Sequence, residues 1–290
     1  MIGRHPWDNR DPHDWSNKSS MKLEVIAKVT PPFTPRWPHH REQKSPILFV
    51  HGAWHAAWCW ENFLPYFADR GYAAYAVSLR GHGASEGRDG LRWYSASHDY
   101  VADIAQVIQT LPHAPILVGH SMGGYVVQKY LETHQATAGV LLASAPVSGL
   151  FGFIVRFGLR HPWPLLKSQL LLNSWPLIET PELAQDAFFS PRMSAAEIAR
   201  HFARLQPESL RVVFEMTLLN LPRPKQVQTP MLVLAAENDR VFSVAEEQAT
   251  AIAYGTEAIV FPDMAHDMML EPNWQQVADR ILDWLRERDL

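Results

Sequence analysis

The residues of this sequence that are best suited to chemistry begin with a serine between small residues. The stretch Gly119-His120-Ser121-Met122-Gly123 has the pattern G-x-S-x-G and separates the apolar run ILVG from a segment with helical spacing. A serine at such a turn has a strained backbone, and glycines on both sides let neighbouring backbone approach it. The pattern predicts that Ser121 is a nucleophile, and the alternative is a chance match on a tight strand-to-helix turn.

A serine hydroxyl is a weak nucleophile at neutral pH and needs a base to accept its proton. Among 14 histidines we select His266, which follows the apolar run Ala258–Phe261 and precedes the last helical segment. Its loop is expected to return to the edge of the sheet beside Ser121. The alternative for a histidine in such a loop is solvent exposure or a helix-cap contact.

A carboxylate must hold the tautomer of this histidine and stabilise its cation. Asp239 directly follows the apolar run Met231–Ala236, whereas Glu237 lies too close to the strand end and Asp263 lies in the histidine's own loop. The segment after the preceding strand, Ser144-Ala145-Pro146, offers no carboxylate. Asp239 is therefore the predicted acid, with an Asx-type turn as the alternative interpretation.

The elements that must position these residues are apolar runs that alternate with helical segments. Buried strands are predicted at 47–50, 73–79, 116–119, 140–143, 231–236 and 258–261, with a half-buried strand within 21–29. Helices are predicted near 58–70, 100–111, 122–134 and 273–288. This alternation predicts an α/β fold with a mostly parallel sheet and helices on both of its faces.

The alternation stops between 147 and 225, a stretch rich in Phe, Leu, Trp and Pro without a convincing strand. We predict several short helices there, inserted into a sheet domain formed by 21–146 and 226–290. Residues 1–20 are polar and without periodicity, and are expected to form a flexible tail.

Taken together, these features resemble the α/β-hydrolase superfamily, and within it the esterases, lysophospholipases and monoacylglycerol lipases. The resemblance covers about 45 to 290 and includes His51-Gly52, the stretch Leu79-Arg80-Gly81-His82-Gly83, the serine turn, and the order Ser, Asp, His along the chain. It implies an α/β-hydrolase sheet with a helical cap over 147–225. Ser78 stands where this family commonly has an aspartate, a departure that concerns only loop architecture.

The resemblance also assigns an oxyanion hole to the backbone N–H groups of Ala53 and Met122, with Trp54 as the competitor of Ala53. His51 is expected to be structural, bonding the loop. Trp54, His120 and four aromatic residues of the insertion are candidates for a substrate pocket, although aromatic side chains at such spacing more often pack helices. The four are Phe151, Phe153, Trp163 and Trp175.

No cofactor or metal is predicted. The stretch GHGASEG misses the G-x-G-x-x-G spacing of a dinucleotide site. His39-His40 has no nearby cysteine or spaced carboxylates, and H-E-x-x-H does not occur. The expected partner is a small-molecule ester or another acyl substrate.

The 290 residues are 47% hydrophobic and 19% charged with a net charge of −4, which predicts a globular protein without a basic field for nucleic acid or anionic membranes. The single cysteine, Cys59, cannot form an internal disulfide, and no apolar run is long enough for a signal peptide or a membrane span. A cytoplasmic protein is expected; the oligomeric state is not predicted.

The expected activity is hydrolysis of carboxylic esters with a moderately hydrophobic part, through an acyl-enzyme on Ser121. A lactonase, an amidase or a carbon–carbon bond hydrolase with the same triad is the nearest alternative. A receptor for small molecules on a retained hydrolase scaffold is an alternative of another class. Haloalkane dehalogenase and epoxide hydrolase chemistry is disfavoured, because those relatives have a carboxylate where this chain has serine.

Overall fold

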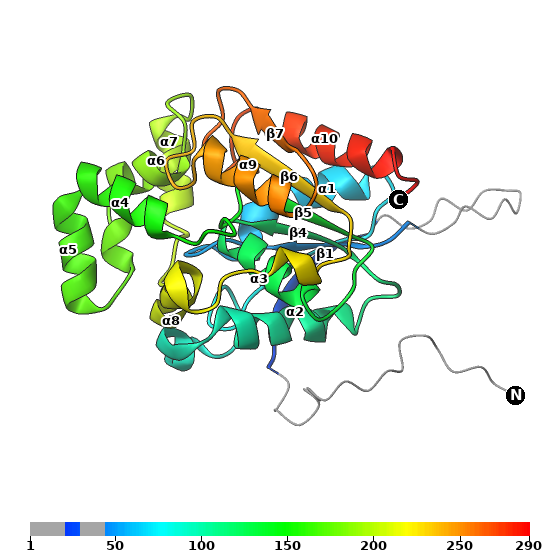
Figure 1. The fold of residues 1–290 in the computed structure, drawn as a ribbon, viewed down its shortest axis with the longest axis horizontal. Coiled ribbons are helices and arrows are strands. Elements are labelled where there is room, and N and C mark those ends of the chain that lie inside the picture. Colours follow the sequence, from blue (N-terminus) through cyan, green and yellow to red (C-terminus); the bar gives the residue numbers. More distant parts are fainter. Residues whose placement is uncertain (1–20, 30–43) are drawn as a thin grey trace, which may run out of the picture.

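Seven strands form one sheet at the centre of the molecule (Figure 1). The strands are β1 (Glu24–Lys28), β2 (Ile47–Val50), β3 (Ala74–Ser78), β4 (Ile116–His120), β5 (Ala138–Leu142), β6 (Met231–Ala236) and β7 (Ala258–Phe261). Their order across the sheet is β1-β3-β2-β4-β5-β6-β7, and only β1 is antiparallel to its neighbour. The predicted fold class is thereby confirmed. The structure is a computed structural model that describes residues 21–29 and 44–290, so the predicted tail and His39-His40 lie outside the described residues.

Helices cover both faces of the sheet. On one side α1 (Phe63–Ala68) contacts α10 (Trp274–Arg286), and on the other α2 (Val101–Ile108) contacts α3 (Met122–Leu131) (Figure 1). Short turns of other helix types are η2 (Ala57–Trp60), η3 (Arg88–Trp93), η4 (Ala96–Tyr100), η5 (Trp175–Leu177), η6 (Glu215–Leu219) and η7 (Pro224–Gln226). The helix predicted over 58–70 is therefore η2 followed by α1. The chain leaves α1 at Gly71, whose φ of 86° suits a residue without a Cβ atom.

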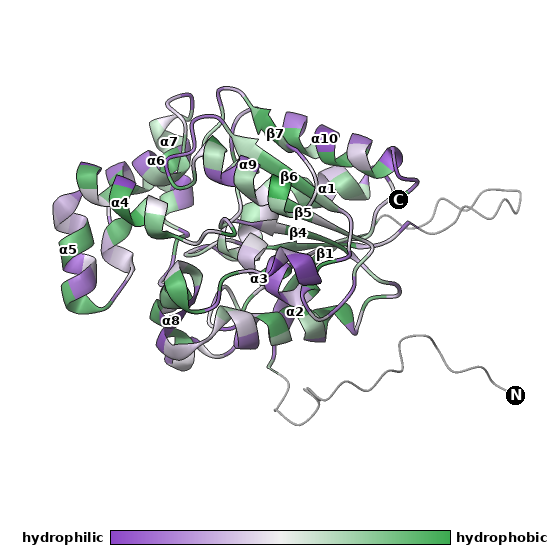
Figure 2. Ribbon diagram, viewed as in Figure 1, coloured by the Kyte–Doolittle hydropathy of each residue, from purple (hydrophilic) through white to green (hydrophobic). Residues whose placement is uncertain are grey.

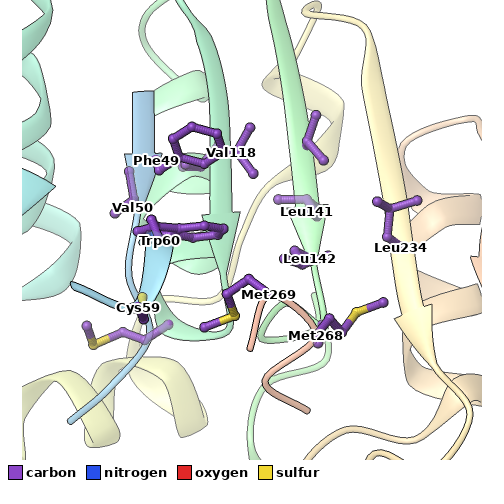
Figure 3. Close-up of a cluster of buried hydrophobic side chains, with 14 of the residues drawn as sticks. Phe49, Val50, Cys59, Trp60, Val118, Leu141, Leu142, Leu234, Met268 and Met269 are labelled. Carbon is purple, nitrogen blue, oxygen red and sulfur yellow. The ribbon is translucent and has the colours of Figure 1, made fainter. Parts of the chain in front are cut away.

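The inner strands are apolar on both faces because helices exclude water from both. Every residue of β2, β4, β5 and β6 is buried, as expected for strands that read as continuous apolar runs. Figure 3 shows Phe49, Val118, Leu141 and Leu234 of these strands in one cluster of buried side chains. The sheet is thus a rigid support for the loops that follow its strands.

Residues 147–225, hereafter the helical insert, leave the sheet after β5 and return before β6. Its helices gather at one end of the sheet (Figure 1) and are α4 (Phe151–Arg160), α5 (Pro162–Leu171), α6 (Pro181–Phe188), α7 (Ala195–Phe202) and α8 (Leu210–Phe214). Hydrophobic residues occur along α4 and α5 (Figure 2), and Leu159 and Leu170 among them are exposed. None of the helices in the described residues has both the length and the hydrophobicity needed to cross a membrane.

Candidate active site

Ser121 lies between β4 and α3 with a backbone that serine rarely adopts. Its φ of 51° and ψ of −118° place it in a region that costs of the order of 1–3 kcal/mol for a residue with a Cβ atom. Its N–H donates to the carbonyl oxygen of Leu142 on the neighbouring strand, at 3.1 Å. The side chain makes no cap hydrogen bond to α3, so its hydroxyl is not committed to holding the helix.

The glycines around Ser121 are required by close backbone contacts. A Cβ atom on Gly119 would lie 2.5 Å from the carbonyl oxygen of Gly123, and one on Gly123 would lie 2.5 Å from that of His51 and still closer to that of Val50. The G-x-S-x-G pattern therefore reflects packing of this turn against the end of β2. Any larger residue at 123 must displace the loop that begins at His51.

We expect Gly123→Ala to destabilise the protein by about 1–3 kcal/mol, because the atoms that it meets are backbone and cannot rotate away. A thermal melt followed by circular dichroism measures this. Gly158→Ala is the matched control, since its Cβ would meet only the side chain of Leu165. Equal melting temperatures for the two variants would contradict the packing described here.

His266 and Asp239 form a buried hydrogen bond. The Nδ1 atom of His266 lies 2.7 Å from Oδ2 of Asp239, and the two side chains are 2% and 1% exposed. Oδ1 of Asp239 accepts hydrogen bonds from the backbone N–H groups of Val241 at 2.7 Å and Phe242 at 3.0 Å. Since an ionised carboxylate only accepts, Nδ1 of His266 carries the proton and Nε2 has a free lone pair. Asp239 thus combines an Asx-type turn with a bond to the imidazole.

The ring of His266 is enclosed by other rings at the edge of the sheet that carries Ser121. Its centroid lies 4.8 Å from that of His120, 6.0 Å from that of Phe188 and 5.4 Å from that of Phe242. Within the part of the chain that the structure describes, no hydrogen bond joins the Ser121 hydroxyl to this ring. Such bonds are often long in free enzymes and shorten when substrate binds.

Two backbone donors near Ser121 are unused. Neither the N–H of Ala53 nor that of Met122 donates a hydrogen bond to any other described residue. Both residues are buried, and Met122 is the first residue of α3, where a helix has unpaired N–H groups. These two groups are therefore available for an oxygen atom that a ligand supplies.

Trp54 and His120, predicted to line a pocket, are both buried beside these residues. Nε1 of Trp54 donates to the hydroxyl of Ser174 in the helical insert at 3.2 Å. Nε2 of His120 donates to the backbone oxygen of His266 at 3.0 Å. His120 thus holds the loop of the candidate base, while its Nδ1 atom has no hydrogen-bond partner among the described residues.

The other four pocket candidates lie in the helical insert. Phe151 and Trp163 are 63% and 67% exposed, whereas Phe153 and Trp175 are half-buried. The ring of Phe153 contacts that of Phe157 at 5.5 Å. No ring contact or hydrogen bond joins any of the four to Ser121 or His266 within the described residues, so their place in a substrate pocket stays a prediction.

A surface cavity of about 670 Å³ opens beside the Asp239 loop. It is lined by residues of the helical insert between 182 and 192, by Asn238, Asp239 and Arg240, and by Asp263 and Ala265. Ser121 and His266 do not line it. We therefore do not propose that this cavity binds the part of a substrate that reacts with Ser121.

Four buried residues of this region were not predicted from the sequence. Phe188 of α6 covers His266, and His55 bonds Asp267, the residue directly after His266, at 3.0 Å. A fourth, Glu247 of α9 (Val244–Ala253), lies behind Asp239. Burial, and then the charge of Asp239, raise the pKa of Glu247 well above its ordinary value, which favours the neutral form of this carboxyl.

One set of side chains has the composition of a metal site. Single atoms of His120, His266 and Asp267 lie within 4.8 Å of one another. Zinc ligands about 2.0–2.1 Å from an ion lie only about 3.4 Å apart in a tetrahedral site. Because Nε2 of His120 and Nδ1 of His266 also serve the hydrogen bonds described above, we assign no metal to this set.

Known proteins resemble this chain over most of its length. The monoacylglycerol lipase of Mycolicibacterium smegmatis is 24% identical over 261 residues, which cover 86% of this chain and 90% of the lipase. A non-heme haloperoxidase of Rhodococcus erythropolis is 26% identical over 252 residues, covering 77% and 86%. The structure of an esterase from Thermogutta terrifontis matches with a TM-score of 0.67 at 18% identity, covering 92% and 94%.

These relatives support hydrolase activity. The model of the alpha/beta hydrolase family matches residues 47–280, from β2 into α10. The match therefore includes the serine turn, the two loops that carry Asp239 and His266, and the helical insert between them. The chain belongs to the alpha/beta hydrolase family.

Proposed function

We propose that this protein is a serine hydrolase that cleaves carboxylic esters through an acyl-enzyme on Ser121. The observation that carries the proposal is the buried 2.7 Å hydrogen bond between His266 and Asp239, at the sheet edge where Ser121 has a positive φ. A protonated Nδ1 leaves Nε2 of His266 free to accept the proton of a serine hydroxyl. The nucleophile is thereby activated without a metal.

In this mechanism Oγ of Ser121 attacks the ester carbonyl carbon while its proton passes to Nε2 of His266. The negative oxygen of the tetrahedral intermediate accepts hydrogen bonds from the N–H groups of Ala53 and Met122. The carbon–oxygen bond of the ester then breaks, and the alcohol leaves with the proton from His266. Water attacks the acyl-enzyme by the same steps and releases the acid.

The enclosure of His266 strengthens these interactions. Because the imidazole and the Asp239 carboxylate are buried among aromatic rings, the charge on one acts strongly on the other. The imidazolium that forms when His266 takes the proton is therefore stabilised by Asp239. The aromatic surroundings also favour substrates with a moderately hydrophobic acyl or alcohol part, which the helical insert would cover as a cap.

Reaction with a fluorophosphonate probe tests this proposal. The wild-type chain is expected to gain the mass of one phosphonyl group, and peptide mapping is expected to find it on Ser121, because the probe reacts only with an activated serine. The same protein unfolded in denaturant is the control and should stay unlabelled. Tight ligand binding without any labelling would instead favour a receptor.

A panel of substrates distinguishes the reaction types. Nitrophenyl esters, an acyl-homoserine lactone, an anilide and a diketone should be compared by kcat/KM, with the esters of short and medium chain length expected to react fastest. Faster turnover of the lactone or of the diketone would assign the site to the lactonases or to the carbon–carbon bond hydrolases.

A further inference from the structure

The loop that carries the Ala53 N–H contacts two buried histidines, His51 and His55. Nδ1 of His51 lies 2.8 Å from the carbonyl oxygen of Gly52, and its Nε2 accepts the N–H of Leu79 at 3.0 Å. Because Nε2 accepts, Nδ1 carries the proton and donates to Gly52. Burial, and then the neighbouring His82, lower the pKa of His51 well below its ordinary value, so this ring is neutral.

His55 contacts the next peptide of the same loop and has a different charge. Its Nδ1 lies 2.7 Å from the carbonyl oxygen of Ala53, and its Nε2 lies 3.0 Å from Oδ2 of Asp267. A carbonyl and an ionised carboxylate only accept, so both ring nitrogens carry protons and the ring is an imidazolium. Burial alone would lower the pKa of His55, but the charge and hydrogen bond of Asp267 outweigh it and raise that pKa.

Asp267 is the carboxylate partner of this ion pair; its Oδ2 bonds His55, while its buried Oδ1 has no hydrogen-bond partner among the described residues. Burial alone would raise its pKa, but the charge and hydrogen bond of His55, together with His120 and His266, outweigh this effect and lower the pKa, which favours the ionised carboxylate. Its backbone N–H donates to the carbonyl of Phe188 at 3.0 Å. The next two residues, Met268 and Met269, point into the cluster of buried side chains (Figure 3). Asp267 therefore links the loop of His266 to the loop of Ala53.

The loop needs such support because its conformation is unfavourable. Trp54 has a φ of 63°, which a bulky residue seldom adopts, and this turn sets the direction of the N–H groups of Ala53 and Trp54. Its carbonyl accepts the backbone N–H of Gln206, at 2.9 Å. His55 adds the only cation that bonds the Ala53 carbonyl among the described residues.

We propose that the buried pair of His55 and Asp267 is a positioning device that fixes the Ala53 N–H relative to His266 and polarises the Ala53 carbonyl with a positive charge. This inference rests on the proposed hydrolase function. The bond from His55 to the Ala53 carbonyl polarises the peptide that carries the Trp54 N–H and stiffens the neighbouring peptide that carries the Ala53 N–H. The hydrogen bond from His55 stabilises the site most when the carbonyl oxygen of the substrate becomes negative, which happens in the transition state.

Asp267→Asn tests the charge while keeping the shape. We expect kcat per active site to fall by about tenfold or more with KM changed by less than about threefold, since the interaction gains strength mainly in the transition state. His55→Gln should give a similar loss, and the double variant should lose little more than either single variant. The matched control is His113→Gln at an exposed position, which should retain wild-type kinetics.

The concentration of active sites is measured by titration with the fluorophosphonate, so that misfolded protein is not counted when kcat is calculated. Nuclear magnetic resonance of protein with ¹⁵N-labelled histidine gives a readout independent of turnover: a histidine with both ring nitrogens protonated is expected in the wild type above about pH 8, where exposed histidines are neutral, and it should be lost in Asp267→Asn. Unchanged kcat per titrated site in Asp267→Asn, with an active wild type, would overturn this inference alone. A wild type that neither hydrolyses esters nor reacts with the probe would overturn the proposed function, and the inference with it.

Discussion

Replacing Ser121 by alanine is expected to lower kcat for a nitrophenyl ester by about 10⁶-fold, because no other group is placed to form the acyl-enzyme. The loss should leave the fold intact. The Ser121 side chain makes no cap hydrogen bond to α3, and alanine at a φ of 51° is strained to the same degree as serine. The melting temperature should therefore match that of the wild type, as judged by circular dichroism.

Ser148→Ala is the matched control for this variant, because Ser148 is exposed at the start of the helical insert and not part of the serine turn. It should hydrolyse the ester at the wild-type rate and react with the fluorophosphonate. Full activity in Ser121→Ala, or a label that remains on that variant, would reject Ser121 as the nucleophile.

The second large effect is expected for Asp239→Asn, which should lower kcat by about 10⁴-fold. The asparagine oxygen can still accept the N–H groups of Val241 and Phe242, so the turn is retained. Its NH₂ group then faces Nδ1 of His266 and donates to it. The proton of the imidazole moves to Nε2, which can no longer accept the proton of Ser121. Steady-state kinetics across pH 5–9 measure the loss.

Asp263→Asn is the matched control, since Asp263 lies in the loop of His266 but has a side chain 74% exposed. Asparagine tolerates the positive φ of 54° at this position, so neither the fold nor the rate should change. Loss of activity in this variant with retention in Asp239→Asn would move the acid from the loop after β6 to the loop after β7.

Strands were easier to predict than helices in this chain. The boundaries of β6 and β7 agree with the predicted runs at 231–236 and 258–261. β6 is buried throughout and is a continuous apolar run, whereas β7, predicted to be buried, is the edge strand and is mostly half-buried, because only one neighbouring strand covers it. Helix α9 was missed. Its start is marked by a capping box in which Ser243 and Glu246 bond each other's backbone N–H groups, a signal present in the sequence as S-x-x-E.

The candidate site was predictable where its residues follow strands. Ser121, Asp239 and His266 each come after β4, β6 or β7, and parallel strands bring their carboxyl ends to one edge. The pair of His55 and Asp267 was not predictable in this way. Burial of an ion pair depends on two partners that are 212 positions apart, and neither residue alone has a sequence signal that separates it from a surface side chain.

The aromatic rings that enclose His266 could likewise not be predicted from the sequence. Phe188 is one of many apolar residues in the helical insert, and nothing in their spacing distinguishes it from Phe151, which is exposed. Which face a short helix turns to the sheet depends on the loops that join it to its neighbours. The apolar composition and the lack of a convincing strand predicted that the insert is helical and apolar, but not which rings reach the site.

Although the helical insert separates them along the chain, β5 and β6 are hydrogen-bonded neighbours in the sheet. A longer or shorter segment between them leaves the hydrogen bonds between β5 and β6 in place. Doubling the length of a loop lowers the stability of the fold by only about 0.6 kcal/mol, through the entropy of closing the loop. Related proteins can therefore differ in helices of the insert that lie away from the candidate site, such as α4 and α5, while α6 must keep the Phe188 that covers His266. The range of ligands that the site admits can therefore change while Ser121, Asp239 and His266 stay the same.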